Sequence, residues 1–280
     1  MPERSGGRPQ ARLRSSPSRS RSASRQAPPP RAPWLPREIA GSPRIPLRER
    51  ISRVPIIELS LVLKDRLRAV EERIEQACRR SGRRRSEITL VAVTKVFPAA
   101  VIRDAYAEGL RHFGENYVQE FAGKAPKLTD LDGAVFHLIG HLQSNKSRTA
   151  SELFQVIQTV DTPKLARRLN ETGKRLEVMV EVKLSDEQAK AGAAPEDVAP
   201  VIEAIRACPN LELLGLMTMP PWSEDAETSR PYFRRLRELG EKHDVGCLSM
   251  GMSNDFEVAI EEGATHIRVG TALFGSRRKK

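Results

Sequence analysis

The sequence predicts a single α/β domain that folds as a closed, parallel (β/α)8 barrel. Its 280 residues are enough for such a barrel, which typically uses about 250 residues as one domain. Eight short apolar runs alternate with stretches of helical periodicity along the chain. These runs are too continuously apolar for a sheet with one face in water, as expected of parallel strands covered on both sides. A doubly wound open sheet is the alternative arrangement.

An amphipathic helix precedes the first apolar run. Between Leu61 and Arg80, apolar residues recur at spacings of three and four, which is the period of one helix face. These residues are Leu63, Leu67, Val70, Ile74 and Ala77. Gly82 ends the helix, because glycine adopts the left-handed conformation of a helix C-terminus without steric strain.

The eight apolar runs are the expected strands, and helices are expected between them. The strands are predicted at 88–94, 110–113, 135–139, 156–160, 176–184, 211–217, 247–250 and 267–269. The intervening helices are predicted at 99–108, 116–124, 163–172, 195–207, 225–243 and 254–262. Pro163 and Pro195 stand at helix starts, where the first turn needs no proline N–H. Gly109, Gly173 and Gly263 stand where helices should stop.

The basic charge belongs to the two ends of the chain. Residues 1–53 carry 13 Arg and 3 Glu, a balance of +10, and residues 277–280 add +4, so the net charge of +11 leaves −3 for the rest. We therefore predict a disordered extension at 1–56, rich in Arg, Ser and Pro, then a barrel at 57–276 and a basic tail at 277–280. The slightly acidic barrel lacks the electrostatic footprint of a nucleic-acid-binding protein.

Three interpretations of the extension stay open: an organellar transit peptide, a tail for nucleic acid or another anionic surface, and a translation start placed too far upstream. We favour a dispensable or misassigned segment, because its prolines oppose the amphipathic helix of a mitochondrial presequence. No run approaches 18 apolar residues, so we expect no membrane span. Cys78, Cys208 and Cys247 are odd in number and lack metal-ligand spacing, which indicates a reducing compartment and a cytoplasmic protein.

Active-site residues of a barrel of this kind lie at the carboxyl ends of the strands, so the polar residues that end each apolar run are the candidate site residues. They are Lys95, Glu115 with Asn116, His141, Asp161, Lys183, Thr218, Ser249, and Arg268 with Gly270 and Thr271. Lys95 ends the run "ITLVAVTK", which places its amine at the mouth of an apolar wall. Desolvation at such a place lowers the pKa of a lysine and makes it a nucleophile that can form an imine.

Two turns rich in glycine and hydroxyl groups follow the seventh and eighth strands, "LSMGMSND" and "RVGTALFG". The loops after these strands form the usual phosphate site of the fold. The candidate phosphate ligands are Ser249, Gly251, Gly270 and Thr271. We expect this cradle to face Lys95 across the barrel mouth, a combination that suits a phosphorylated aldehyde.

From about Leu61 to Phe274 the chain resembles the pyridoxal phosphate homeostasis protein family, whose fold is similar to the N-terminal barrel domain of alanine racemase, fold type III among pyridoxal phosphate proteins. The matching stretches are "LVAVTK", "HFGENYVQE", "HLIGHLQSNK", "LEVMVEVKLS", "LLGLMTMP", "LSMGMSNDFEVAI" and "IRVGTALFG". Thr94 departs from the serine usual in the family, and "VFP" follows the lysine where a Thr-Lys-Pro type sequence is commoner. These departures from the family pattern affect the residues expected on the substrate side of the pocket.

The resemblance implies pyridoxal 5′-phosphate as the cofactor, held as a Schiff base on Lys95. It also implies that Asn116 and Met217 lie near the ring of the cofactor. The implied phosphate ligands are Ser249, Met250, Gly270 and Thr271, and Arg268 is implied to face the pyridine nitrogen. The implied role is vitamin B6 homeostasis, with pyridoxal-phosphate-requiring apoenzymes as partners. We expect a monomer.

A carrier is favoured over an enzyme, and a weak amino-acid racemase is the alternative. An arginine at the pyridine nitrogen can only donate, so the ring would be a poor electron sink. Alanine racemase takes its second base, a tyrosine, from a domain after the barrel, and this sequence ends within a dozen residues of the last strand. Tyr106 and Tyr232 fall in predicted helices, and Tyr117 lies near a strand end.

Two further clusters carry no predicted chemistry. His137 and His141 sit four apart around the third strand, but no third metal ligand is near in sequence, so we expect satisfied or surface histidines. The acidic residues Glu257, Glu261 and Glu262 are predicted to form a solvated helix face.

Overall fold

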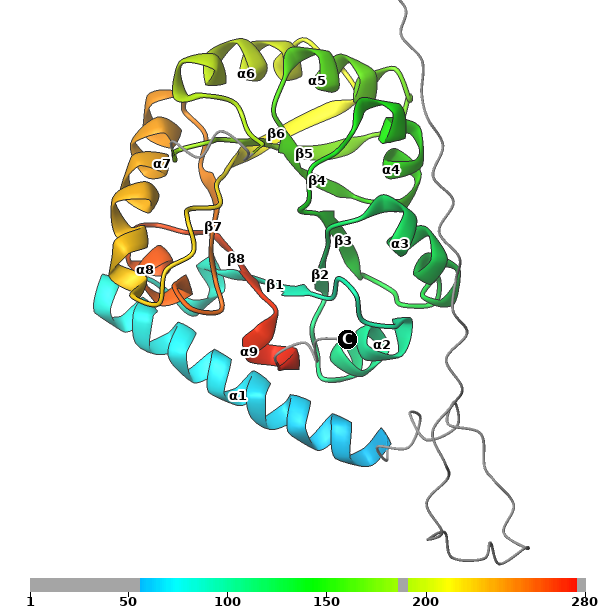
Figure 1. Ribbon diagram of the computed structural model, residues 1–280, viewed down its shortest axis with the longest axis vertical. Helices are drawn as coiled ribbons and strands as arrows, with labels where there is room; N and C mark the ends of the chain where they lie inside the picture. Colours follow the sequence, from blue (N-terminus) through cyan, green and yellow to red (C-terminus); the bar gives the residue numbers. More distant parts are fainter. Residues whose placement is uncertain (1–55, 186–190, 276–280) are drawn as a thin grey trace, which may run out of the picture. The chain divides into compact units, whose positions relative to one another are not determined.

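The computed structural model describes residues 56–185 and 191–275, with side chains from residue 62 onward. Within this part of the chain, eight parallel strands pair in sequence order and close into a barrel (Figure 1). The strands are β1 Thr89–Val93, β2 His112–Glu115, β3 Val135–Leu138, β4 Val156–Val160, β5 Leu176–Glu181, β6 Leu211–Met217, β7 Cys247–Met252 and β8 His266–Val269. β1 pairs with β8, with Leu90 opposite Ile267, so the predicted barrel is confirmed and the open sheet is wrong.

Helices surround the ring of strands (Figure 1). They are α1 Ile56–Ser81, α2 Ala99–Ala107, α3 Val118–Lys124, α4 Ser147–Leu153, α5 Pro163–Asn170, α6 Val198–Arg206, α7 Arg230–Lys242, α8 Phe256–Glu261 and α9 Thr271–Phe274. Short 3-10 helices are η2 Arg85–Glu87, η3 Ala125–Lys127, η4 Ser144–Lys146, η5 Pro195–Asp197 and η6 Ala226–Ser229. α4 and α9 are absent from the sequence prediction. α4 buries Ser147, Ala150 and Ser151, and such small residues form no apolar stripe.

The predicted helix ends agree with the structure. Pro163 opens α5, and the Thr162 hydroxyl caps it by accepting the Leu165 N–H at 3.2 Å. Gly109, Gly173 and Gly263 have φ of 96°, 73° and 103°, the left-handed region that ends a helix.

Three strands differ from their predicted bounds by two residues or more, among them β7, which ends at Met252 and not at residue 250. β2 runs to Glu115 and begins at His112, two residues later than predicted at each end. The prediction followed apolar residues and therefore stopped before Glu115, although this carboxylate is buried because a lysine pairs with it. β5 ends at Glu181, three residues before Leu184.

The main core lies between the outer face of the barrel and the helices. Its largest buried side chains include Phe113, Phe121, Phe154, Phe233 and Phe256. Aromatic pairs such as Phe121 with Phe154, whose ring centroids are 4.9 Å apart, fill the space between α3, α4 and the sheet. Helix α1 packs against α8 and α9.

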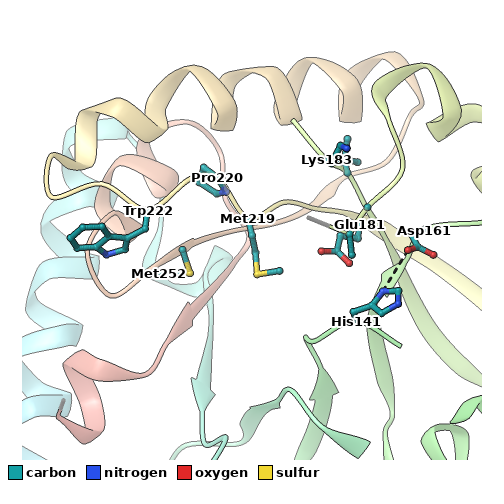
Figure 2. Close-up of a pocket in the computed structure, with 11 residues that line it drawn as sticks. His141, Asp161, Glu181, Lys183, Met219, Pro220, Trp222 and Met252 are labelled. Carbon is teal, nitrogen blue, oxygen red and sulfur yellow. Dashed lines mark ion pairs between the residues drawn. The ribbon is translucent and has the colours of Figure 1, made fainter. Parts of the chain in front are cut away.

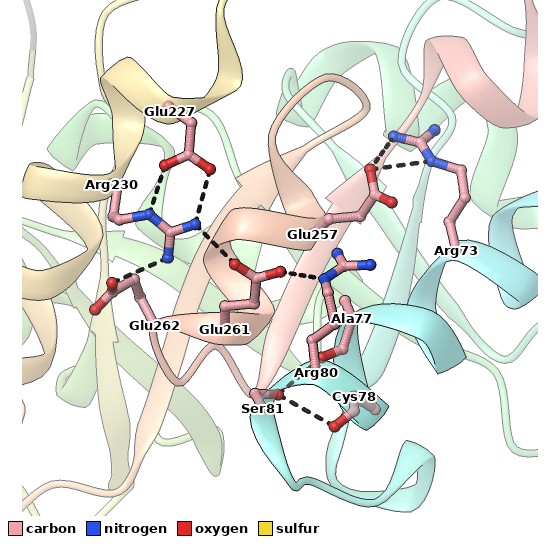
Figure 3. A network of polar contacts seen from close by, with 10 residues as sticks. All are labelled: Arg73, Ala77, Cys78, Arg80, Ser81, Glu227, Arg230, Glu257, Glu261 and Glu262. Carbon is pink, nitrogen blue, oxygen red and sulfur yellow. Dashed lines mark hydrogen bonds and ion pairs between the residues drawn. The ribbon is translucent and has the colours of Figure 1, made fainter.

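The acidic residues of α8 are ion-paired, so their prediction as a solvated face is wrong (Figure 3). Glu257 pairs with Arg73 at 2.8 Å, and Glu261 pairs with Arg80 at 2.6 Å and with Arg230 at 2.7 Å. Sequence spacing could not reveal these contacts, because the arginines come from α1 and α7. We call these contacts, together with the pair of Glu262 and Arg230 at 3.2 Å, the α8 network.

The predicted extension and basic tail lie outside the described residues, apart from Ile56, which begins α1. No described helix has the length and apolarity needed to cross a membrane. Cys78, Cys208 and Cys247 are all free thiols in the structure.

Candidate functional site at the barrel mouth

A cavity of about 610 Å³ opens at the carboxyl ends of β1, β2, β7 and β8. Five predicted site residues line it: Lys95, Asn116, Arg268, Gly270 and Thr271. The prediction that the lysine and the anion cradle face each other across the mouth is wrong. Barrel closure makes β1 and β8 neighbours, and a Cβ added to Gly270 would lie 3.3 Å from Val93 Cβ. Lys95 and the cradle therefore lie on adjoining strands.

The side chains of Met217, Ser249 and Met250 do not line this cavity. Met217 and Ser249 are fully buried, and the two residues are register partners on β6 and β7. Met250 belongs to the core between the sheet and the helices. Successive residues of a strand point to opposite faces, so Ser249 and Met250 cannot both face the barrel interior.

Ser253 is a cavity residue that the strand-end list missed. Its hydroxyl accepts the N–H groups of Gly270 and Ala272 at 3.2 and 3.1 Å, so it ties the turn after β7 to the turn after β8. Gly251 precedes it with φ of 91°, and a Cβ there would lie 2.5 Å from Ala259 Cβ. Ser253 stands within "LSMGMSND", so the motif contained the signal although the individual residue was not selected.

Arg268 is held inside the barrel beneath the cavity. It is 3% exposed, and its guanidinium donates to Ser249 Oγ at 2.6 Å and to the Thr218 carbonyl at 2.8 Å. Burial lowers the pKa of Arg268 to about 10, while Asp255 and Glu181 act in the opposite direction. The group therefore remains a cation at neutral pH.

A line of neutral hydrogen bonds continues behind Arg268 through the barrel interior. Ser249 Oγ donates to Gln158 Oε1 at 2.7 Å, and the Gln158 amide lies 3.0 Å from His137 Nδ1. His137 Nε2 then lies 2.9 Å from His112 Nδ1. Burial lowers the pKa of both histidines, which keeps this chain neutral. We call it the interior chain.

Lys95 follows β1 and is half-buried. Both neighbouring residues are held by charged side chains: Thr94 Oγ1 donates to Glu115 Oε1 at 2.8 Å, and the Val96 N–H donates to Glu120 Oε1 at 2.6 Å. Lys124 joins the two carboxylates. Asn116, next to Glu115, has a buried Oδ1 with no hydrogen-bond partner. This oxygen can therefore accept a hydrogen bond from a bound ligand.

A second cavity of about 1030 Å³ adjoins the first, and Met219, Trp222 and Met252 line both (Figure 2). Its polar residues are His141, Asp161, Glu181 and Lys183. His141 Nδ1 lies 3.7 Å from Asp161 Oδ2. Burial, together with Asp161, raises the pKa of Glu181 to about 7, and Arg268 opposes that shift.

His137 and His141 lie in different surroundings. One is hydrogen-bonded in the interior and the other is exposed, in agreement with the prediction of satisfied or surface histidines. His137 is buried in the interior chain, whereas His141 lines the second cavity with its side chain 53% exposed. Among the described residues, no group of three potential metal ligands occurs.

Comparison with known proteins identifies the family. The profile described as "Alanine racemase, N-terminal domain" matches residues 66–278. The pyridoxal phosphate homeostasis protein of Pseudomonas aeruginosa is 45% identical over 221 residues, which cover 77% of this chain and 96% of the relative. The human protein of the same name is 42% identical over 235 residues, covering 75% and 85%. The chain belongs to the pyridoxal phosphate homeostasis protein family.

Solved structures agree with this assignment. PipY of Synechococcus elongatus PCC7942, solved with PLP bound, is 39% identical with a TM-score of 0.66, and the match covers 76% of this chain and all of PipY. Alanine racemase from Corynebacterium glutamicum is 18% identical with a TM-score of 0.58, over 78% of this chain and 61% of the racemase. The second likeness concerns the fold alone.

Proposed function

We propose that this protein binds pyridoxal 5′-phosphate at the barrel mouth and acts in intracellular vitamin B6 homeostasis, without a reaction of its own. The observation that carries the proposal is the convergence on one cavity of Lys95, Asn116, Arg268 and the Gly270–Thr271 turn. The family relatives named for this role and the PLP-bound PipY structure support it.

The residues present fit this cofactor. The buried Asn116 Oδ1, which has no hydrogen-bond partner among the described residues, can accept a hydrogen bond from a ligand. The turn at Gly270 lies close to Val93, and Ser253 fixes it through two backbone N–H groups, so the backbone at the cradle is held in place. Arg268 adds a buried cation below the same cavity. A phosphorylated, aromatic aldehyde matches this set of an amine, an acceptor, a cation and a rigid turn.

Bound pyridoxal phosphate supplies an aldehyde that a primary amine holds reversibly as a Schiff base. Lys95 would provide that amine. Gly270 and Thr271 would hold the phosphate, with Ser253 bracing their backbone. Arg268 would face the ring nitrogen, and as a cation without acceptor capacity it would leave that nitrogen unprotonated. Met217, Ser249 and Met250 would contribute from behind the cavity wall, Ser249 by holding Arg268.

A carrier is favoured over a racemase of the alanine racemase type, whose second base is a tyrosine. A racemase needs a second acid-base group on the far side of the substrate. Among described residues, no tyrosine lines either cavity. The Tyr106 hydroxyl donates to the Asp132 carbonyl on the outside of the barrel, Tyr232 lies in α7, and Tyr117 is 57% exposed beside α3. We infer that the protein holds and hands over the cofactor to apoenzymes.

Reduction of the loaded protein tests the attachment point. Purified protein mixed with pyridoxal phosphate should acquire the absorbance of an imine, and borohydride followed by peptide mapping should place the label on Lys95. Lys95→Ala should abolish this label, whereas Lys183→Ala, in the adjoining cavity, should keep it. A colourless wild type, or a label on another lysine, would refute the proposal.

A second measurement separates the carrier from the racemase. The loaded protein should restore activity to a pyridoxal-phosphate-dependent apoenzyme. It should not exchange the α-hydrogen of alanine in deuterium oxide above the rate of free cofactor. Exchange that disappears in Lys95→Ala would favour the racemase.

A further inference from the structure

The segment that carries Lys95 is held on both sides by one cluster of charged side chains. On one side, Thr94 donates its hydroxyl to Glu115, and the Thr94 carbonyl accepts from Lys124 Nζ at 3.0 Å. On the other side, the Val96 N–H donates to Glu120. The two residues that flank Lys95 are therefore anchored to the end of β2 and to α3.

The cluster itself is compact and largely removed from water. Lys124 Nζ lies 2.9 and 3.0 Å from the two oxygens of Glu115 and 2.6 Å from Glu120 Oε1. The Glu115 side chain is fully buried, that of Lys124 is 9% exposed and that of Glu120 is 26% exposed. Glu120 and Lys124 are four residues apart on α3, so one helix face presents both to the β1–α2 turn.

Val96 shows why the anchor matters. Its φ is 63°, a left-handed conformation that a β-branched residue rarely adopts. The side chain is 53% exposed, so burial of Val96 does not compensate for this strain. A residue in such a conformation persists only where its surroundings hold it, and such residues gather at functional sites. The Val96 N–H donates to Glu120, and the Phe97 N–H donates to the Thr94 carbonyl at 3.1 Å across the same turn, so Glu120 is the side chain that holds the Val96 backbone directly.

We propose that Glu115, Glu120 and Lys124 are positioning residues that fix the backbone at Thr94 and Val96 and thereby aim the Lys95 amine into the cavity. The proposal rests on the proposed function, because Lys95 must be the point of attachment. It assigns a role to the motif "HFGENYVQE" that reaches beyond Asn116: its two glutamates brace the neighbouring strand end.

Variants of Glu120 test the proposal with pyridoxal phosphate as the probe. Glu120→Ala removes the acceptor of the Val96 N–H, whereas Glu120→Gln retains an acceptor oxygen. We expect borohydride trapping at Lys95 to slow by about ten- to a hundredfold in the alanine variant, since small misplacements of a reacting group have effects of this size. The glutamine variant should recover most of the rate. Gln119→Ala, at an exposed neighbour on α3, is the matched control and should match the wild type.

The circular dichroism of the bound chromophore gives a second readout that general destabilisation would not produce. It reports how rigidly the ring is oriented, and it should weaken in Glu120→Ala. Val96→Gly separates positioning from stability, because glycine tolerates the left-handed conformation. The N–H of residue 96 still donates to Glu120 in this variant, so it should react at the wild-type rate with unchanged dichroism and melt at the same temperature as the wild type or higher.

The outcomes distinguish the two proposals. If the wild type forms no adduct at Lys95, the proposed function itself fails. If the wild type reacts at Lys95 and Glu120→Ala keeps its rate and dichroism, the positioning role alone is overturned. If Glu120→Ala does not fold, Glu120→Asp takes its place with the same expected slowing, because its shorter side chain draws the acceptor away from the Val96 N–H.

Discussion

The molecule contains two networks of ion pairs with similar chemistry and different surroundings. The cluster of Glu115, Glu120 and Lys124 lies beneath the mouth of the barrel, and its central pair is almost inaccessible to water. The α8 network lies on the outside between α1, α7 and α8 (Figure 3). Its side chains are more exposed, for example 49% for Arg80 and 20% for Glu261.

Burial gives the two networks different consequences. An exposed ion pair contributes about 0–1 kcal/mol, because water and salt screen it. Removal of one partner from a buried pair leaves an uncompensated charge and costs about 3–5 kcal/mol. The Glu115–Lys124 pair should therefore be insensitive to salt, whereas the attachment of α1 to the barrel by the α8 network should depend on ionic strength.

The largest effect is expected from Lys124→Met, which leaves Glu115 buried without its cation. We expect a loss of about 3–5 kcal/mol in the free energy of unfolding, measured in urea near neutral pH. Burial already raises the pKa of Glu115, and Lys124 opposes that shift. A raised folded-state pKa means that the folded protein takes up a proton more readily than the unfolded chain, so the deficit should shrink as the pH falls. The double variant with Glu115→Gln should recover much of the loss, and a deficit of under 1 kcal/mol would contradict the comparison.

Glu181 extends the comparison of buried and exposed charges to a carboxyl without an ion-pair partner of its own in the cavity wall. It is buried, and its Oε2 has no hydrogen-bond partner in the described part of the chain. Its folded-state pKa is about 7, above the ordinary 4.5, so ionisation above pH 7 disfavours the folded state. Glu181→Gln should raise the free energy of unfolding by about 3 kcal/mol at pH 8, from the size of this shift. The gain should fall as the pH drops through 7 and vanish below about 4.5.

Denaturation of Glu181→Gln across this pH range measures the effect. The control Glu238→Gln changes an exposed glutamate on α7 and should show no such pH dependence. A gain at pH 8 that persists unchanged at pH 4 would mean that ionisation of Glu181 is not its cause.

We expect an intermediate loss of stability from a substitution in the interior chain, whose polar groups are neutral. Gln158→Leu removes the link between Ser249 and His137 and leaves both without that partner. Unsatisfied buried polar groups lower the free energy of unfolding by about 1–3 kcal/mol. Because the substitution leaves no charge without a partner, this loss should not change with salt. Met179→Leu, another fully buried position in the barrel wall, controls for packing. A salt-dependent loss would contradict a neutral chain.

The sequence predicts the barrel well because its signals are local. Each strand is an apolar run, and each helix stop at Gly109, Gly173 and Gly263 is a residue with a defined conformation. Lys95 and Arg268 were found because they end such runs. The directions of Ser249 and Met250 could also have been derived, since residues alternate between the two faces of a strand.

The contacts that support the site could not be predicted in the same way. The bond from the Val96 N–H to Glu120 spans 24 residues, and the strain of Val96 leaves no trace in residue type. Glu181 was missed because it stands inside an apolar run, where only the closed barrel reveals that it faces Arg268. The α8 network joins α8 to α7 and to α1, which lies more than 170 residues away, so the local charge pattern predicted a face in solvent.

The smallest effect is expected on the outer network, where Glu261→Gln removes the pairs with Arg80 and Arg230. Both arginines have water nearby, and Arg230 keeps its contacts with Glu227 and Glu262, so we expect a loss of about 1 kcal/mol. The loss should shrink further in about 1 M salt, where the Debye length is about 3 Å. The loss from Lys124→Met should stay the same in that buffer, because its partner is shielded from solvent ions. Equal salt sensitivity of the two variants would show that burial does not separate the two networks.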